Sequence, residues 1–301
     1  MHIVITGGTG LLGRALISLM QPQGHTFTVF TRDPDAQRSA MPAVQLAPWT
    51  PTQPNALARH LRGADAVVNL MGENIAAKRW DDARKQALYE SRVHGSRALA
   101  AAIRLAQPRP GVLLQASAVG YYGDRGDEFL DENTPPGDDF LARLCVDWEN
   151  STATVETLGV RRAILRTGVV LSKDGGALPR LLLPIRFGLG GPLGSGKQWM
   201  PWIHIADHAA ATAFLLMNAN ASGPFNLTAP EPVTNAEMVH AIARRLRRPA
   251  FLRAPEFALR FALGEMSAML LASQRVLPKR LLAAGYEFQF PTLESALDDL
   301  L

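Results

Sequence analysis

The chain has 301 residues, of which 47% are hydrophobic, and it carries a formal net charge of +4. This length and composition allow a large buried core, arranged as one domain or as two lobes. No uncharged apolar run reaches the roughly 18 residues of a membrane-spanning helix, nothing marks a signal peptide, and Cys145 is the single cysteine. We therefore expect a cytoplasmic protein with no membrane partner, no disulfide framework and no thiolate metal cluster.

Short apolar runs alternate with helical patterns from the N-terminus to about residue 166. In chain order, the pattern predicts a strand over 2–6, a helix over 11–20, strands over 26–31 and 65–71, a long helix over about 80–106, a strand over 112–117, a helix over about 139–158 and a strand over 162–166. Strands that are apolar throughout and alternate with helices indicate a parallel sheet covered on both faces. With right-handed crossovers, the predicted fold class is α/β, a doubly wound parallel Rossmann sheet.

The regular alternation ends after Thr167. Glycine and proline then divide the chain into shorter elements, most densely over 188–196, so we expect a smaller helix-rich C-terminal lobe. The predicted organisation is a dinucleotide-binding domain over 1–170, to which 202–230 returns, and a substrate-side lobe over 171–301.

A glycine-rich turn joins the first predicted strand to the first predicted helix, with a glycine at every third position. In a dinucleotide-binding loop of this kind, the first glycine makes the tight turn. The second lets the backbone approach a pyrophosphate, and the third lets the helix pack closely on the strand. The N–H groups that open the helix then face the phosphates. The expected cofactor-binding residues of the loop are Gly7, Thr9, Gly10, Leu11, Leu12 and Gly13.

The end of the second strand predicts which dinucleotide binds. NAD-binding proteins usually place an acidic residue there, about 20 residues after the loop, to hold the ribose hydroxyls. Here Thr31 occupies that position, and Arg32 can hold a 2′-phosphate through its planar guanidinium group. Asp33 leaves NAD open, because a shift of two residues in register would bring its carboxylate to the ribose. The predicted cofactor is NADP(H), with NAD the less favoured alternative.

Further motifs follow in a characteristic order along the chain. They lie at 69–75, 117–123, 166–171, 188–196, 202–207, 278–280 and 285–286. With the glycine loop, they give the chain a resemblance to the extended short-chain dehydrogenase/reductase superfamily. The resemblance is closest to an atypical branch, of the NAD-dependent epimerase/dehydratase type, with a C-terminal domain of unknown function, here at about 248–295. It implies NADP(H) binding and cofactor contacts from Leu70, Met71, Gly72 and Val170, but no particular substrate.

Two residues central to catalysis in that superfamily have no counterpart at the matching positions. The superfamily uses a tyrosine as acid/base and a lysine that lowers its pKa. If Glu149 matches the acidic residue four positions after the lysine, the lysine position is Cys145 and the tyrosine position is Leu141. Neither side chain can replace the original one. No Tyr-x-x-x-Lys sequence occurs anywhere in the chain.

The superfamily's other two catalytic positions are an asparagine and a serine. Arg92 stands at the asparagine position, where it could hold a phosphate or ribose of the cofactor or be a plain surface arginine. The serine position is Ser117 or Ala118, depending on register. Tyr121 and Tyr122 follow the strand over 112–117, at the carboxyl edge where ligands bind. The candidate catalytic residues are therefore Ser117, Tyr121 and Tyr122, with packing as the alternative role of the two tyrosines.

The segment over 191–197 begins like a phosphate-binding P-loop. Gln198 stands where a serine or threonine must bind Mg²⁺, so we reject that interpretation. The nearby side chains Lys197, Gln198, Trp199 and Trp202 still offer a cation and aromatic faces. A substrate-side site and a structural loop are the two interpretations of this segment. The seven histidines show no metal-ligand spacing, so no metal site is expected.

The basic residues are dispersed rather than clustered in a stripe, which disfavours a nucleic-acid partner. A small-molecule substrate, anionic or nucleotide-linked, is the expected partner, and a homo-oligomer stays open. Two functions fit the sequence. The first is an NADP(H)-dependent oxidoreductase or epimerase with a non-standard acid/base and an unknown substrate. The second is a catalytically silent NADP(H)-binding sensor or regulatory protein.

Overall fold

The computed structural model describes residues 1–301, and its centre is a parallel sheet of seven strands. The order across the sheet is β3 (Gln45–Pro48), β2 (Thr26–Thr31), β1 (His2–Thr6), β4 (Ala66–Asn69), β5 (Val112–Ala118), β7 (Arg161–Thr167) and β12 (Gly223–Leu227). Every neighbouring pair is parallel. The chain starts near the middle and winds outwards in both directions, which confirms the doubly wound α/β fold class.

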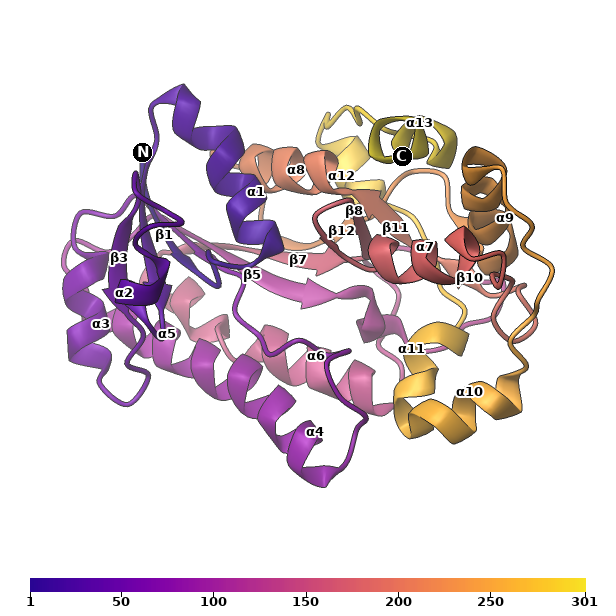
Figure 1. The fold of residues 1–301 in the computed structure, drawn as a ribbon. Helices are drawn as coiled ribbons and strands as arrows, with labels where there is room; N and C mark the ends of the chain where they lie inside the picture. The colour runs from indigo at the N-terminus through magenta and orange to yellow at the C-terminus, as the bar shows by residue number, and fades with distance from the viewer.

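Helices cover both faces of this sheet (Figure 1). On one face lie α1 (Leu11–Met20) and α8 (Ile205–Met217), and on the other lie α3 (Pro54–Leu61), α5 (Gly95–Leu105) and α6 (Phe140–Asn150). Apolar residues at helical spacing face the sheet, such as Leu16 and Met20 of α1 and Leu99 and Ile103 of α5, each at most 1% exposed. The sheet is therefore buried on both sides, as its continuously apolar strands require.

The long helix predicted over 80–106 has a discontinuity in its middle. It comprises α4 (Asp82–Tyr89), a π-helical turn over Glu90–His94 and α5. A π-turn adds one residue to the helix and changes the direction of the side chains around it, and such turns are frequent at functional sites. The apolar periodicity continues through the turn, so the sequence pattern does not reveal it. The turn carries Arg92.

Other element boundaries also differ from the prediction. The helix predicted over 139–158 ends at Asn150, and a 3₁₀ segment over Ala153–Leu158 follows it. β3 and α3 were not predicted, because they are short and lie among Pro48, Pro51 and Pro54, which resemble loop signals. The short α2 (Pro34–Gln37) and β6 (Phe129–Leu130) were also missed.

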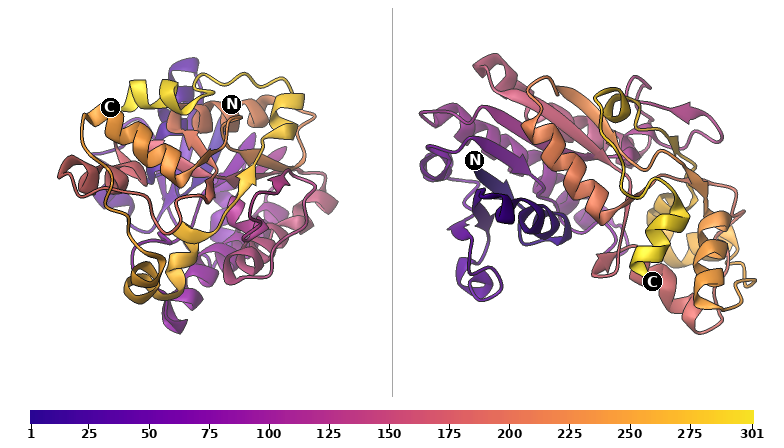
Figure 2. Two further views of the ribbon diagram at one scale, coloured as in Figure 1. Left: turned by 90° about the vertical axis from the view of Figure 1, so that its right-hand side faces the viewer. Right: turned by 90° about the horizontal axis from the view of Figure 1, so that it is seen from above.

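The helix-rich lobe lies beyond the carboxyl ends of β5 and β7 (Figures 1 and 2). Its helices are α7 (Leu178–Arg186), α9 (Asn235–Leu246), α10 (Glu256–Leu263), α11 (Ala268–Leu271) and α13 (Leu293–Leu300), whereas α12 (Lys279–Ala283) packs on β12 of the sheet. Its short strands are β8 (Val169–Ser172), β9 (Gly175–Gly176), β10 (Trp199–Met200), β11 (Trp202–His204), β13 (Val233–Thr234) and β14 (Arg275–Val276). This position leaves the edge of the sheet where ligands bind facing the lobe.

The last segment of the chain is fastened to α8 by one buried carboxylate. Asp207 accepts hydrogen bonds from the Tyr286 hydroxyl (2.9 Å) and from the backbone N–H groups of Gln289 (2.8 Å) and Phe290 (2.9 Å). These charge-assisted bonds fix the C-terminal segment beside the sheet. None of the helices is long and apolar enough to pass through a bilayer.

Candidate cofactor and active site

The glycine loop connects β1 to α1 at the carboxyl edge of the sheet. Gly7 has a φ of +70°, and a Cβ atom there would lie 2.5 Å from the Leu70 carbonyl oxygen, so only glycine fits. Gly10 donates its N–H to the Gly7 carbonyl (3.0 Å) and caps α1 without using a side chain. A Cβ at Gly10 would meet only that carbonyl, at 3.3 Å. Backbone atoms of the chain after β4 therefore fill the space next to Gly7. The space next to Gly10 is open, and the start of α1 presents free N–H groups there.

The start of α1 is packed tightly against the loop. A Cβ atom at Gly13 would lie 2.4 Å from the Gly8 Cα atom, so the third glycine allows the close helix–strand contact. The Leu11 side chain lies within 3.5 Å of a Cβ position at Gly176 in β9. Val170 lies in β8, the partner strand of β9. The β8–β9 hairpin of the second lobe thus borders the glycine loop.

The end of β2 carries Thr31, Arg32 and Asp33. One oxygen of the exposed Asp33 carboxylate accepts the N–H of Ala36 (3.0 Å) and caps α2. The Arg32 side chain is 84% exposed and pairs with Glu73 (3.1 Å), which follows β4. Because β1 and its loop lie between β2 and β4, the Arg32 guanidinium group stands beside the loop.

The segment after β4 approaches the π-turn. A Cβ atom at Gly95 would lie 2.5 Å from the Met71 sulfur, and one at Gly72 would lie 3.0 Å from the Arg92 guanidinium carbon. Arg92 donates to the Glu73 carbonyl (3.0 Å) and lies 5.1 Å from the centre of the Trp148 ring in α6. Burial lowers the pKa of Arg92. The π-turn thus directs a partly buried guanidinium group towards the carboxyl edge of the sheet.

The hydroxyl of Ser117, at the end of β5, belongs to a buried ion pair. Ser117 donates to Glu149 (2.7 Å), and Glu149 accepts two further hydrogen bonds from Arg166 of β7, each 2.9 Å long. Burial lowers the pKa of Arg166, but the hydrogen bonds and charge of Glu149 outweigh that effect and raise it. The Ser117 hydroxyl therefore has a structural partner at the end of β5.

Tyr121 and Tyr122 follow β5 but differ in their surroundings. Tyr122 is fully buried, donates to Asn226 of β12 (2.7 Å) and accepts from Arg166 (3.2 Å). Burial raises the pKa of Tyr122 to about 12, so its hydroxyl stays protonated at neutral pH. Tyr121 is only partly buried, its ring lies 3.4 Å from the Arg166 guanidinium carbon, and its hydroxyl has no protein partner. Of the two phenols, Tyr121 is the one available to a ligand.

Leu141 and Cys145 lie one turn apart on α6, beneath this edge. A Cβ atom at Gly120 would meet the Leu141 Cβ at 3.4 Å and the Cys145 sulfur at 3.9 Å. Burial, with the nearby charge of Glu149, raises the pKa of Cys145 to about 12. The thiol is therefore neutral and unreactive at neutral pH. Neither residue supplies a proton or a charge here.

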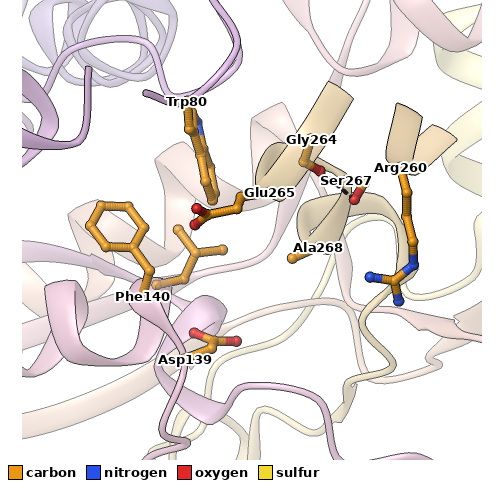
Figure 3. A pocket seen from close by; sticks show the side chains of 9 residues that line it. Trp80, Asp139, Phe140, Arg260, Gly264, Glu265, Ser267 and Ala268 are labelled. Atoms are coloured by element: carbon orange, nitrogen blue, oxygen red, sulfur yellow. Dashed lines mark hydrogen bonds between the residues drawn. The ribbon is translucent and has the colours of Figure 1, made fainter. Parts of the chain in front are cut away.

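A cavity of about 340 Å³ lies beside Leu141, between the start of α6 and the segment over 260–268. Figure 3 shows Phe140 and Asp139 on one side, Gly264 and Ser267 on the other, Glu265 between them and Trp80 above. The Trp80 and Phe140 rings meet edge to face, 5.4 Å apart. Such a volume suits a small organic molecule. The position that matches the superfamily's tyrosine thus borders a cavity.

The four residues of the predicted substrate-side site are spread through the second lobe. Trp202 is 1% exposed and donates to the Glu231 carbonyl, and Gln198 is buried and donates to the carbonyls of Leu193 and Leu270. Trp199 donates to Asp127, and Lys197 is exposed. None of the four lines the cavity at Leu141. Their contacts hold the loop over 191–200 in place, and a role towards substrate stays a prediction.

Sequence reasoning missed Glu73 and Asn226 and the partnership of Glu149 with Arg166. Arg166 ends a run of apolar residues in β7, and a charge inside an apolar strand signals a buried counterion. That signal was present in the sequence, but the position of its partner was not. No three histidine, cysteine, aspartate or glutamate side chains gather where they could hold a metal ion.

This geometry defines a Rossmann-type protein with a glycine-rich loop at the carboxyl edge of its sheet and a cavity beside α6. The family model of the NAD dependent epimerase/dehydratase family matches residues 3–228, and that of a domain of unknown function (DUF1731) matches residues 254–300. The chain belongs to the NAD-dependent epimerase/dehydratase family, and the resemblance noted from its motifs is confirmed.

Relatives are similar over nearly their whole length. Epimerase family protein Mb2239 of Mycobacterium bovis is 42% identical over 98% of this chain and 96% of its own. Bovine epimerase family protein SDR39U1 is 38% identical over the full length of both chains. The crystal structure of human SDR39U1 with NADPH has a TM-score of 0.90, with 36% identity over 100% of this chain and 99% of that one. UDP-glucose 4-epimerase of Thermus thermophilus shares the fold (TM-score 0.77) at 17% identity.

Proposed function

We propose that the protein is an NADP(H)-dependent oxidoreductase or epimerase that acts on a small molecule with an acid/base other than Tyr-x-x-x-Lys. One observation carries the proposal: the loop is open beside Gly10, and the exposed guanidinium group of Arg32 stands at the end of β2. Asp33 uses one of its carboxylate oxygens to cap α2, which weakens the argument for NAD. The similar human protein, crystallised with NADPH, supports the same assignment.

The cofactor residues follow from this placement. Backbone N–H groups at the start of α1 would bind the pyrophosphate, and Arg32 would bind the 2′-phosphate. The other residues that we assign to this site are Gly7, Thr9, Leu11, Leu12, Gly13, Thr31, Leu70, Met71, Gly72 and Val170. NADP(H) supplies a hydride donor or acceptor when it is bound.

Among the candidate catalytic residues, Tyr121 is the proposed proton donor or acceptor. The hydroxyls of Ser117 and Tyr122 already donate to Glu149 and Asn226, whereas the Tyr121 hydroxyl has no protein partner. The guanidinium group of Arg166 lies against the face of the Tyr121 ring and holds it in place through a cation–π contact. Ser117 and Tyr122 then position Arg166 through the buried network.

The second candidate function is a catalytically silent NADP(H)-binding protein. The observation that favours it is the pair Leu141 and Cys145, since neither a leucine nor a neutral thiol can replace an acid/base and its lysine. In both cases we propose a cytoplasmic protein in which the lobe over 171–301 covers the cofactor's nicotinamide end.

Consumption of NADPH by the native protein, measured against a panel of carbonyl compounds and nucleotide sugars, tests the proposal. Tyr121→Phe should lower kcat by about 10²–10⁴-fold, the usual loss of a general acid or base, with NADPH affinity unchanged. Leu141→Phe and Cys145→Ala should retain activity apart from packing losses, and Tyr89→Phe, on α4, is the matched control. Tight NADPH binding with no turnover on a broad panel would favour the silent protein. A large loss in Cys145→Ala would refute our interpretation of α6.

A further inference from the structure

Three guanidinium groups gather around Glu73, which follows β4. Arg32 lies 3.1 Å and Arg84 3.5 Å from the Glu73 carboxylate, and Arg92 donates to the Glu73 backbone carbonyl (3.0 Å). No other carboxylate lies within 4.0 Å of these three groups. The cluster of Arg32, Arg84, Arg92 and Glu73, called here the Glu73 cluster, therefore has two positive charges in excess.

Arg84 and Arg92, two of the three guanidinium groups, are largely shielded from water. The Arg84 side chain is 12% exposed, and its Nε atom is buried without a hydrogen-bond partner. Arg92 has only backbone carbonyls as acceptors and no ion-pair partner, and burial lowers its pKa. A buried cation without a counterion costs free energy, so proteins normally supply one.

Arg166 provides the comparison, because a buried carboxylate compensates its charge. Arg166 has both oxygens of Glu149 at 2.9 Å, and its pKa is raised. The Glu73 cluster lacks such a carboxylate for Arg84 and Arg92. A ligand that brings an oxyanion would complete the cluster, since guanidinium groups bind carboxylate and phosphate oxygens in a fork.

The position of Arg92 indicates which ligand that is. Arg32 faces the β2 side of the glycine loop, where the adenosine half of a dinucleotide lies. Arg92 lies against Trp148 of α6, the helix that also carries Leu141 beside the cavity. Arg92 is thus on the side of β4 that faces β5 and Tyr121.

We propose that Arg84 and Arg92 of the Glu73 cluster bind an acidic group of the substrate. The substrate is then a small carbonyl compound that carries a phosphate or a carboxylate, rather than a neutral one. This inference rests on the proposed function, because it takes the dinucleotide to occupy the glycine loop. In this proposal Arg32 binds the cofactor, and Arg84 and Arg92 bind the substrate.

Oxyanion binding by the NADPH-saturated protein tests the proposal without a known substrate. The unfolding temperature is measured in inorganic phosphate and in acetate, each against sodium chloride at equal ionic strength, so that the two oxyanions are compared separately. At least one should raise the unfolding temperature of the native protein. In Arg92→Gln and Arg84→Gln the apparent affinity for that oxyanion should fall about tenfold or more. Arg97→Gln, an exposed arginine on α5, should behave as the native protein does.

A second measurement separates binding from a structural role. If Arg92 serves to bind a ligand, its unpaired buried charge destabilises the ligand-free protein. Ligand-free Arg92→Gln should therefore unfold at the same temperature as the native protein or higher. A structural arginine would show the opposite. If Arg84→Gln does not fold, Arg92→Gln and Arg92→Lys still decide the matter.

Three results would overturn the proposal. The first is no oxyanion effect on the loaded native protein, and the second is an effect that persists in Arg92→Gln. The third is competition between phosphate and NADPH together with a more than tenfold loss of NADPH affinity in Arg92→Gln, because the cluster would then serve the cofactor. Failure of the native protein to bind NADPH would instead refute the proposed function, and the ligand-free phosphate titration would still report on the cluster.

Discussion

Arg166 and Glu149 face each other in the interior with two hydrogen bonds of 2.9 Å, and both side chains are at most 9% exposed. Removal of one partner leaves the other charge buried and unpaired, which costs about 3–5 kcal/mol. Glu149→Gln should therefore lower the free energy of unfolding by about that amount in urea titrations. Glu156→Gln is the control, because Glu156 pairs with Arg162 but is 49% exposed, and its loss should cost less than about 1 kcal/mol. Similar losses for the two variants would contradict a buried charge pair.

Substitution of glycine by alanine should have different effects at Gly10 and at Gly13. A Cβ atom at Gly10 has only one neighbour, at 3.3 Å, whereas one at Gly13 would lie 2.4 Å from the Gly8 Cα atom. Gly10→Ala and Gly10→Val should keep the native unfolding temperature and lose NADPH affinity, because the side chain fills the space for the pyrophosphate. Gly13→Ala should instead lower the unfolding temperature. Normal NADPH binding by Gly10→Val, measured by fluorescence titration, would mean that the phosphates bind elsewhere.

Arg32 should decide between the two dinucleotides. Loss of a charge-assisted contact to the 2′-phosphate costs about 1.5–3 kcal/mol, which is roughly a ten- to hundredfold change in affinity. Arg32→Ala should weaken NADPH by that factor and change NADH little. Arg38→Ala is the matched control, since Arg38 is also exposed and pairs with Asp35 next to α2. Equal affinity of the native protein for NADPH and NADH, measured by calorimetry, would refute the assignment.

His208 should make the protein sensitive to acid. Burial lowers its pKa to about 4 in the folded protein, from an ordinary value of 6.5. Between these values the unfolded chain binds a proton that the folded protein does not, so stability falls as the pH drops from 6.5 to 4. The shift corresponds to about 3 kcal/mol. His208→Gln should flatten this part of the unfolding profile, whereas the exposed His240→Gln should leave it unchanged. An unchanged profile in His208→Gln would show that other groups cause the acid sensitivity.

The doubly wound sheet, the family and the glycine loop between β1 and α1 can all be read from the sequence alone. These depend on local rules, because apolar strands, helical periodicity and glycines at every third position each act over a few residues. The absence of a Tyr-x-x-x-Lys sequence was equally readable, since it requires no alignment.

The partners of the buried and charged side chains are set by the tertiary structure. It pairs Glu149 with Arg166, 17 residues apart, and Tyr122 with Asn226, 104 residues apart. The Tyr121 hydroxyl, by contrast, has no protein partner. The tertiary structure also places three arginines around Glu73, through a π-turn that leaves the apolar periodicity intact. Such pairings depend on which parts of the chain meet at the edge of the sheet, and charges distant in sequence carry no local sign of their partners.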